Sequence, residues 1–426
     1  MNFLSYLVIV LITVNLFRMS SYIIASNIDI LLTNIKKHKQ KKIRMYKSEY
    51  LPSVTVLVPA HNEEYCVIKT IESICKSVYP PSKLNIIIIN DGSTDNTKKV
   101  VKEFLSGYNA EFNIRLINQK NKGKAGALNY ALKKYVDTTL VMTLDADSEI
   151  DKRAIRNSAA HFRDQSVLAA SSNVNIVENG SVLGLAQRFE YAIGYQMKRA
   201  ESRGNIEYII GGVGAMFRHK ALREVGYFDT NTQTEDIDLT LKLLAHYGNK
   251  EYKLIHAHDA ISYTAPVLSL KSLIKQRLRW KYGRWQTFIK HKHLFFSKNK
   301  KFNRLLTWVI LPYALLQEVM MLIEPLAIAL TFYYAAYYGD ITTFLFAIIV
   351  VTGHVLINIW ASDSITIPER LRLTYYAIPM YLILYVISFV EYAAIVLGFI
   401  KIHKIRLSIN DRHTTWKSPE RVLAKI

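Results

Sequence analysis

Hydrophobic and polar positions divide the chain into three parts. Residues 3–32 are mostly apolar, residues 51–265 alternate short apolar runs with polar stretches, and long apolar stretches recur at about 304–338, 343–362 and 374–400. Each of the terminal stretches is long enough to cross a bilayer, whereas the runs in the middle have the length of buried strands. The pattern therefore predicts a soluble domain flanked by α-helical membrane-spanning segments.

Short strands alternate with helices in the middle part. The strands are predicted at residues 54–60, 84–91, 114–118, 139–147 and 166–174. Helical patterns lie between them, at residues 62–78, 94–106 and 123–136. Apolar strands that are each followed by a helix are typical of a largely parallel, doubly wound α/β sheet of the Rossmann-like kind. In such a sheet the ligand site lies at the carboxyl ends of the strands.

Positive charge follows the first apolar segment and does not precede it. A dense basic run occupies residues 36–47, whereas a cleaved signal peptide carries its positive charge before the apolar core. We therefore expect residues 1–32 to form a transmembrane helix with its N-terminus outside. Residues 33–50 then form a basic juxtamembrane linker, and the domain at 51–265 lies in the cytosol.

The net charge of the chain limits the kinds of partner that it is expected to bind. Lys and Arg number 55 against 34 Asp and Glu, which gives a formal net charge of +21. Such an excess indicates either nucleic acid or an anionic membrane, and a basic run beside an apolar span favours lipid headgroups over nucleic acid. The two cysteines, which have neither CxxC nor zinc-ligand spacing, argue against a disulfide scaffold.

The C-terminal part has a basic amphipathic segment, three apolar stretches and a basic tail. Residues 266–303 are predicted to lie along the membrane surface, residues 304–400 to cross the membrane, and residues 401–426 to form the tail. Glu318 and Glu324 fall inside the first apolar stretch, so we expect them to face protein, water or a pore. The basic tail favours a cytosolic C-terminus, which three spans would not give, and the number of passes stays open.

Acidic motifs follow the predicted strands. Four of them stand out: Asn62-Glu63-Glu64, Asn90-Asp91-Gly92-Ser93, Asp145-Ala146-Asp147 and Thr234-Glu235-Asp236-Ile237-Asp238. Each alone also fits a turn or a helix cap. The first three close strands that we expect to be parallel, so their carboxylates should meet in one crevice. Because carboxylates gathered there repel each other, the cluster indicates a bound cation.

A divalent cation and a diphosphate would account for the acidic cluster. Mg²⁺ and Mn²⁺ are commonly held by one or two carboxylates together with substrate phosphates. If the DxD motif is extended, Asp145 and Asp147 point the same way, so that one could face a nucleotide and the other the metal. Asp236 is then available as a general base for an attacking hydroxyl.

The motifs resemble those of the processive family 2 glycosyltransferases, which are the membrane synthases of β-linked glycans such as cellulose, chitin, hyaluronan and poly-N-acetylglucosamine. The resemblance covers roughly residues 50–290. It rests on the acidic motifs above together with residues 58–64, Gly123-Lys124-Ala125-Gly126-Ala127-Leu128-Asn129 and Gln276-Arg277-Leu278-Arg279-Trp280. Within the family, the single leading span, the QRLRW sequence and residues 415–421 are most similar to bacterial poly-β-1,6-N-acetylglucosamine synthases of biofilm matrix.

The resemblance implies a GT-A-type domain, a UDP-sugar donor and a growing glycan chain as acceptor. It assigns Glu63 and Asp91 to uracil and ribose, and Asp236 to the role of catalytic base. Further substrate contacts are implied for Lys124, Asp145, Glu235, Gln276, Arg279 and Trp280. Asp145 and Asp147 would hold Mg²⁺ or Mn²⁺. Arg279 would pair with the diphosphate, and Trp280 would stack on the acceptor sugar.

The resemblance also implies a multi-pass protein of the cell membrane, with the lipid bilayer and a small accessory membrane protein as partners. Lys281-Tyr282-Gly283-Arg284 departs from the expected pattern of small and Gln/Gly residues, so hyaluronan- and chitin-like products remain open. A transferase that loads one sugar onto a polyprenyl phosphate is a second reading, which the QxxRW motif counts against. A basic membrane transporter is a third.

Overall fold

A computed structural model describes most of the chain. It covers residues 17, 20–33, 35, 50–108, 111–177, 179–339, 341–362 and 365–400. Residues 20–33 form a helix. Most of the first apolar segment, the basic run at 36–47 and the tail at 401–426 lie outside the described residues, as does the side chain of Glu324.

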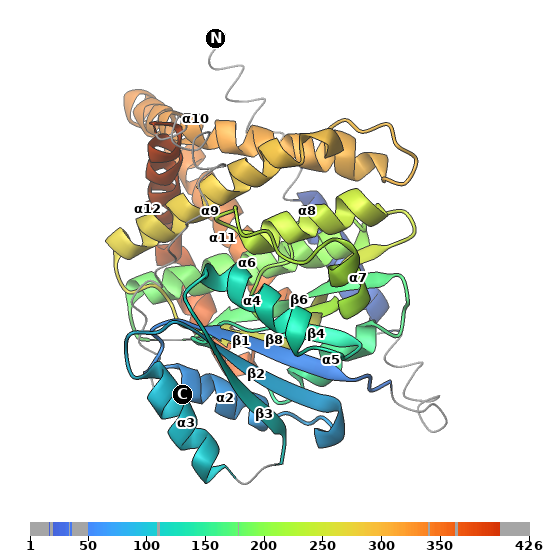
Figure 1. The fold of residues 1–426 in the computed structure, drawn as a ribbon. Coiled ribbons are helices and arrows are strands. Elements are labelled where there is room, and N and C mark those ends of the chain that lie inside the picture. The colour runs from blue at the N-terminus through green and yellow to red at the C-terminus, as the bar shows by residue number, and fades with distance from the viewer. Residues whose placement is uncertain are drawn as a thin grey trace.

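One mixed eight-stranded sheet forms the centre of the molecule, in the order β3-β2-β1-β4-β7-β6-β8-β5 (Figure 1). The strands are β1 (Val54–Ala60), β2 (Leu84–Asp91), β3 (Asn113–Gln119), β4 (Leu140–Thr143), β5 (Ser148–Ile150), β6 (Val167–Ile176), β7 (Ala215–Arg218) and β8 (Lys253–Thr264). The first four strands of the order run parallel, and β6 is parallel to β8. Strand β7 is antiparallel to both of its neighbours, and β5 is antiparallel to β8.

Four of the seven strand pairs are therefore parallel, in keeping with the predicted largely parallel sheet, and the three antiparallel pairs all involve β5 or β7. The missed strands have weak sequence signals: β5 and β7 are only three and four residues long. Strand β8 carries His256, His258 and Asp259 in its middle, which breaks the apolar run. The strand expected at 139–147 ends at Thr143, because a turn follows in which the Ser148 N–H donates to the Asp145 carbonyl at 3.1 Å.

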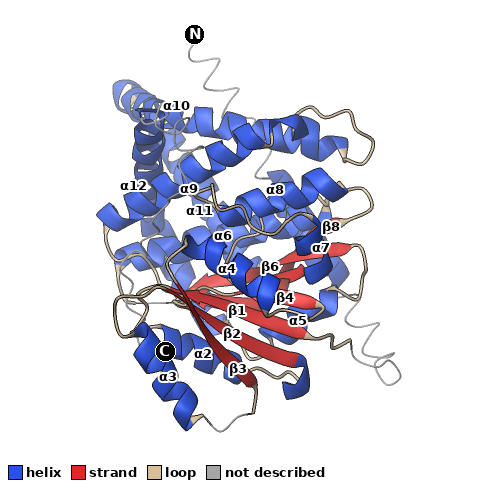
Figure 2. Ribbon diagram, in the orientation of Figure 1, coloured by secondary structure: helices blue, strands red, loops and turns tan. Residues whose placement is uncertain are grey.

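Helices cover both faces of the sheet (Figure 2). Ile86 and Ile88 of β2 pack with helices α2 (Val67–Cys75), α3 (Thr97–Gly107) and α5 (Ala154–His161). Ile87 and Ile89 face the opposite core, to which helices α4 (Gly123–Lys134) and α8 (Glu235–Tyr247) contribute. Side chains alternate between the faces of a strand, so burial of both faces explains why β2 reads as an unbroken apolar run.

The remaining helices lie on the α4 and α8 side of the sheet (Figure 1). They are α6 (Val182–Arg203), α7 (His219–Glu224), α9 (Leu270–Lys290), α10 (Leu311–Tyr338), α11 (Ile341–Ala361) and α12 (Ile367–Ile400). A π-helical segment, Leu305–Ile310, precedes α10, and short 3₁₀ turns occupy Pro81–Lys83 and Lys292–Leu294. Phe189 of α6 packs with Ile359 of α11 and Leu373 of α12 in a third core.

Each apolar stretch predicted near the C-terminus forms one long helix. Within the part of the chain that the structure describes, no helix is both long enough and apolar enough to span a membrane. Glu318 of α10 is 2% exposed and contacts Lys281 and Arg284 of α9, so it faces protein as expected.

Candidate active site

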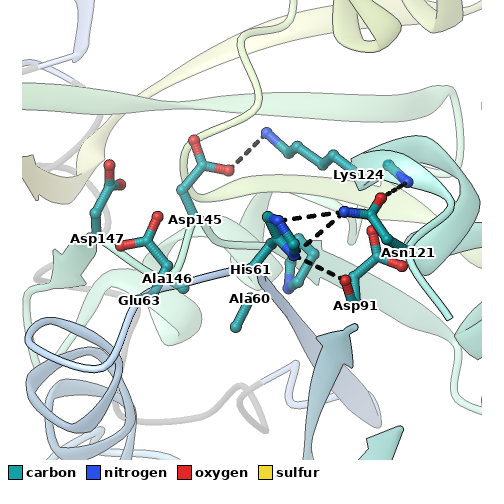
Figure 3. A pocket seen from close by; sticks show the side chains of 11 residues that line it. Ala60, His61, Glu63, Asp91, Asn121, Lys124, Asp145, Ala146 and Asp147 are labelled. Carbon is teal, nitrogen blue, oxygen red and sulfur yellow. Dashed lines mark hydrogen bonds and ion pairs between the residues drawn. The ribbon is translucent and has the colours of Figure 1, made fainter. Parts of the chain in front are cut away.

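A pocket of about 410 Å³ lies at the carboxyl ends of β1, β2 and β4 (Figure 3). This is the edge at which the sequence predicts a ligand site, because β1, β2 and β4 are parallel. The predicted residues that line the pocket are Glu63, Asp91, Lys124, Asp145 and Asp147. Acidic side chains from three separate motifs thus share one cavity.

Asp91 is held rigidly at one side of the pocket. Its side chain is buried, and Oδ1 accepts hydrogen bonds from Gln119 Nε2 at 2.6 Å and from the Lys122 backbone N–H at 2.9 Å. His61 Nδ1 lies 2.9 Å from the Asp91 backbone oxygen. The carboxylate therefore has a fixed orientation before any substrate arrives, as a group that recognises one face of a ligand requires.

His61 and Asn121 also line the pocket, and the sequence reasoning gave neither of them a role. Asn121 Nδ2 lies 3.2 Å from His61 Nε2 (Figure 3). His61 belongs to the motif at residues 58–64, which also contains Glu63. Asn121 comes shortly before the segment at residues 123–129, which contains Lys124. Both residues follow a strand, β1 and β3 respectively, and this position is the sequence feature that could have identified them as pocket residues.

Lys124 bridges the acidic groups. Its Nζ lies 2.6 Å from Asp145 Oδ1 and 3.1 Å from Glu235 Oε1 (Figure 3 draws the first of these pairs). Burial alone would lower the pKa of Lys124, but the charges of Asp145, Glu235 and Asp236 outweigh it and raise the pKa above its ordinary value. The ammonium group is therefore the resident counter-charge of the cluster.

Asp236 lies beside this group, in the first turn of α8. Its Oδ2 accepts a hydrogen bond from the Gly212 N–H at 3.1 Å, and its Oδ1 accepts one from its neighbour Ile237 at 2.9 Å. Burial, followed by the charge of Glu235, raises the pKa of Asp236 to about 6. A carboxylate with a pKa in this range can accept a proton near neutral pH, which is the property of a general base.

The donor atoms of Asp145 and Asp147 suit a divalent cation. The Asp147 side chain is buried and its Oδ1 accepts a hydrogen bond from the Ser148 hydroxyl at 3.1 Å. Within the described ranges, no group of three or more His, Cys, Asp or Glu side chains is placed to hold a metal ion. Two carboxylates with substrate phosphates supplying the other ligands are a usual arrangement for Mg²⁺. The expectation that the DxD motif is extended is wrong, because the motif lies in a turn after β4.

Gln276, Arg279 and Trp280 do not line the pocket, although α9 packs directly on the motif that contains Asp236. A Cβ atom on Gly283 would overlap the side chain of Thr234, and Gln286 Oε1 accepts a hydrogen bond from the Gln233 N–H at 3.2 Å. Arg279 and Trp280 lie about one helical turn before Gly283 on the same helix. The structure thus brings Glu63, Asp91, Lys124, Asp145 and Asp147 to the pocket, with Glu235 paired to Lys124 and Asp236 beside it. Gln276, Arg279 and Trp280 lie on α9, the helix that packs on α8.

The glycine-rich loop before β7 approaches Asp236 closely. A Cβ atom on Gly212 would lie 2.9 Å from Lys124 Nζ and 3.6 Å from Asp236 Oδ2. Gly214 has φ +64°, and a Cβ atom there would overlap Ser262 and lie 2.8 Å from Ser172 Oγ. Gly212 therefore packs closely against Lys124, and Gly214 packs closely against Ser172 and Ser262.

Replacing Gly214 with alanine is expected to destabilise the protein more than the same change at Gly180. Gly180 has a similar φ of +71° but open space around it, so Gly180→Ala should cost about 1 kcal/mol in backbone strain. Gly214→Ala adds the overlap with two serines, which should cost roughly 1–3 kcal/mol more. Thermal unfolding of both variants measures the difference, and equal shifts would show that the loop is not tightly packed.

Three comparisons place the chain among known proteins. The sequence profile described as Glycosyl transferase family 2 matches residues 55–226. The poly-beta-1,6-N-acetyl-D-glucosamine synthase of Staphylococcus epidermidis is 35% identical over 254 residues, covering 58% of this chain and 59% of that protein. The protein of the same name from Staphylococcus aureus (strain COL) is 33% identical over 289 residues, which cover 67% of both chains. The alignment thus spans about three fifths of the S. epidermidis protein.

The fold has a solved counterpart. The mannosyltransferase PcManGT from Pyrobaculum calidifontis, in complex with GDP-Man and Mn²⁺, superposes with a TM-score of 0.52 at 19% sequence identity, over 90% of this chain and 98% of that one. This likeness shows a GT-A-like fold for the domain. The matching family profile and the 33% identity to the S. aureus protein over 67% of both chains confirm the predicted resemblance: the chain belongs to glycosyl transferase family 2.

Proposed function

We propose that the protein is an inverting glycosyltransferase that polymerises a β-linked N-acetylglucosamine-type polysaccharide from a UDP-sugar, UDP-GlcNAc in the first instance. The observation that carries the proposal is the meeting of Asp91, Asp145 and Asp147 around one pocket, with Lys124 and Asp236 beside it. The relatives named poly-beta-1,6-N-acetyl-D-glucosamine synthase support the sugar and the polymer.

The reaction follows from the positions of the charged groups. The acceptor hydroxyl gives its proton to an Asp236 carboxylate oxygen as its own oxygen attacks the anomeric carbon of the donor sugar. The bond between that carbon and the diphosphate oxygen breaks, and UDP leaves with the bonding electron pair. Attack from the face opposite the leaving group inverts the anomeric centre, so an α-linked donor gives a β-linked product.

The leaving diphosphate needs positive charge beside it. Lys124 supplies one such charge, because it already lies 2.6 Å from Asp145 at the pocket wall. Asp145 and Asp147 would hold Mg²⁺ or Mn²⁺, which when bound neutralises the charge that grows on the departing diphosphate. Asp91, with its fixed carboxylate, would hold the nucleoside.

We further propose that helices α10, α11 and α12 embed the protein in the cell membrane and that the product is exported there. Large apolar side chains are exposed on these helices: Tyr337, Ile349 and Tyr375 are 69%, 67% and 78% exposed. Exposed apolar surface of this kind is typical of a protein or membrane contact. The basic runs at 36–47 and 401–426 support an anionic lipid surface as the neighbour.

Incubation of protein-containing membranes with UDP-[¹⁴C]GlcNAc tests the proposed activity. The expected result is labelled polymer that stays in the aqueous phase after extraction with organic solvent, and its loss on digestion with a β-1,6-specific glucosaminidase supports that linkage. Digestion by chitinase or hyaluronidase instead would assign a different polymer. A lipid-soluble product that carries one sugar would favour the polyprenyl-phosphate reaction, and absence of turnover with every UDP-sugar would contradict the proposal.

A further inference from the structure

Six charged side chains form a cluster along α9, in which Arg277, Lys281 and Glu318 are buried and the other three are partly exposed. Three are cations of α9, and three are carboxylates from three other helices: Arg277, Lys281 and Arg284 with Glu190 of α6, Glu318 of α10 and Glu391 of α12. The formal charges cancel. None of these residues belongs to the pocket at the ends of the strands.

The contacts make the cluster continuous. Arg277 Nη2 lies 2.6 Å from Glu190 Oε2, and its Nη1 lies 3.7 Å from Glu391 Oε1. Lys281 Nζ lies 3.3 Å from Glu391 Oε2 and 3.0 Å from Glu318 Oε2. Arg284 Nη1 completes the chain at 2.7 Å from Glu318 Oε1. One face of α9 is therefore joined by ion pairs to three other helices.

A cluster of buried ion pairs is an unusual way to fix the position of a helix. Arg277, Lys281 and Glu318 are 4%, 7% and 2% exposed, so their charges lose most of their hydration. Buried ion pairs are seldom more stabilising than apolar packing of the same volume, but they favour one arrangement over others because every shift leaves a charge unpaired. The cluster should therefore define the position of α9 more than it adds to stability.

The cluster also contacts Trp280, the residue to which the resemblance to processive family 2 glycosyltransferases assigns the acceptor sugar. The Arg277 guanidinium carbon lies 4.5 Å from the centre of the Trp280 ring. Arg277 is itself held between two carboxylates, so the cation that stacks on the indole cannot move freely. Lys281 and Arg284, the other two cations, are also the positions at which the sequence departs from the pattern expected after QxxRW.

We infer that this ionic cluster positions Trp280 for the growing glycan and thereby sets how many sugars are added before the chain is released. Arg277, Lys281, Glu318 and Glu391 are positioning residues, which act on the acceptor through Trp280 and take no part in the transfer itself. The inference rests on the proposed function, and on the contact with the acceptor sugar that the family resemblance implies for Trp280. It predicts that disturbing the cluster separates chain extension from use of the donor.

The experiment compares Arg277→Met with Arg277→Lys in purified membranes supplied with UDP-GlcNAc. Two products are measured: sugar incorporated into polymer, and free sugar released by hydrolysis of the donor. Loss of the stacked cation in Arg277→Met should lower the ratio of incorporation to hydrolysis about fivefold and shorten the chains, with UDP affinity unchanged. Arg277→Lys keeps the charge and should recover part of the ratio. Lys275→Met, at an exposed position of the same helix, is the control and should behave as the wild type.

A second variant tests the inference in case Arg277→Met does not fold. Lys281→Met combined with Glu318→Gln removes one cation and one carboxylate together, so the remaining charges still cancel. Shorter chains with unchanged UDP binding in this variant support the inference. Folded variants that bind UDP and make chains of wild-type length at the wild-type ratio would overturn it. If the wild type itself does not incorporate GlcNAc, that result contradicts the proposed function. It differs from the result that contradicts the positioning role, in which the wild type is active and the variants behave like it.

Discussion

Asp236→Asn should abolish sugar transfer while leaving UDP binding unchanged. Asparagine keeps the size of the side chain and an oxygen for the Gly212 N–H, but it cannot accept the acceptor proton. Removing a general base costs about 10²–10⁴ in rate, so incorporation from UDP-[¹⁴C]GlcNAc should fall by about that factor. Isothermal titration with UDP is the parallel measurement. Incorporation at the normal rate would refute the assignment of Asp236 as the base.

The pH dependence of the wild type provides an independent check on the same residue. Because burial and Glu235 raise the pKa of Asp236 to about 6, its carboxylate becomes protonated as the pH falls through that value. The ratio kcat/KM should therefore decline on the acid side of about pH 6. Removal of the neighbouring charge in Glu235→Gln should lower the pKa of Asp236 and move this decline to lower pH.

Lys124→Met should weaken both the fold and donor binding. Without the ammonium, Asp145 and Glu235 are left facing each other across a partly buried site, and the loss should cost about 2 kcal/mol after allowance for water in the pocket. UDP affinity should fall about tenfold, because a charge-assisted contact to phosphate is lost. Lys120→Met, at an exposed position before the same helix, is the control.

Thermal unfolding and UDP titration of Lys124→Met and Lys120→Met test the predicted losses of stability and of donor affinity. A more stable Lys124→Met protein that binds UDP normally would mean that the cluster does not need its resident cation. In that case the charge beside the diphosphate would have to come from elsewhere in the site.

The sequence predicted the strand-end half of the site well. Strands β1 and β2 are long apolar runs with both faces buried, so their ends, and the carboxylates that follow them, could be located without a structure. Strands β7 and β8 were not predictable in the same way. Strand β7 has four residues, and β8 is interrupted by histidines, so neither has the periodic pattern of apolar residues that predicts a strand.

The individual hydrogen bonds and ion pairs between distant residues could not be predicted. Nothing in the local pattern says that Lys124 meets both Asp145 and Glu235, or that Gly212 donates to Asp236, because each contact depends on how the elements pack. The same holds for Lys281 and Glu318. The sequence marked the first as a departure and the second as a costly charge, and only the structure shows that they pair.

Anomalous scattering from Mn²⁺ in crystals of the protein grown with UDP would locate the metal and the nucleotide in the same experiment. We expect one strong peak beside the carboxylates of Asp145 and Asp147, next to the UDP diphosphate, with the nucleoside on the Asp91 side of the pocket. UDP bound elsewhere, or Mn²⁺ on residues remote from these two aspartates, would contradict this expectation.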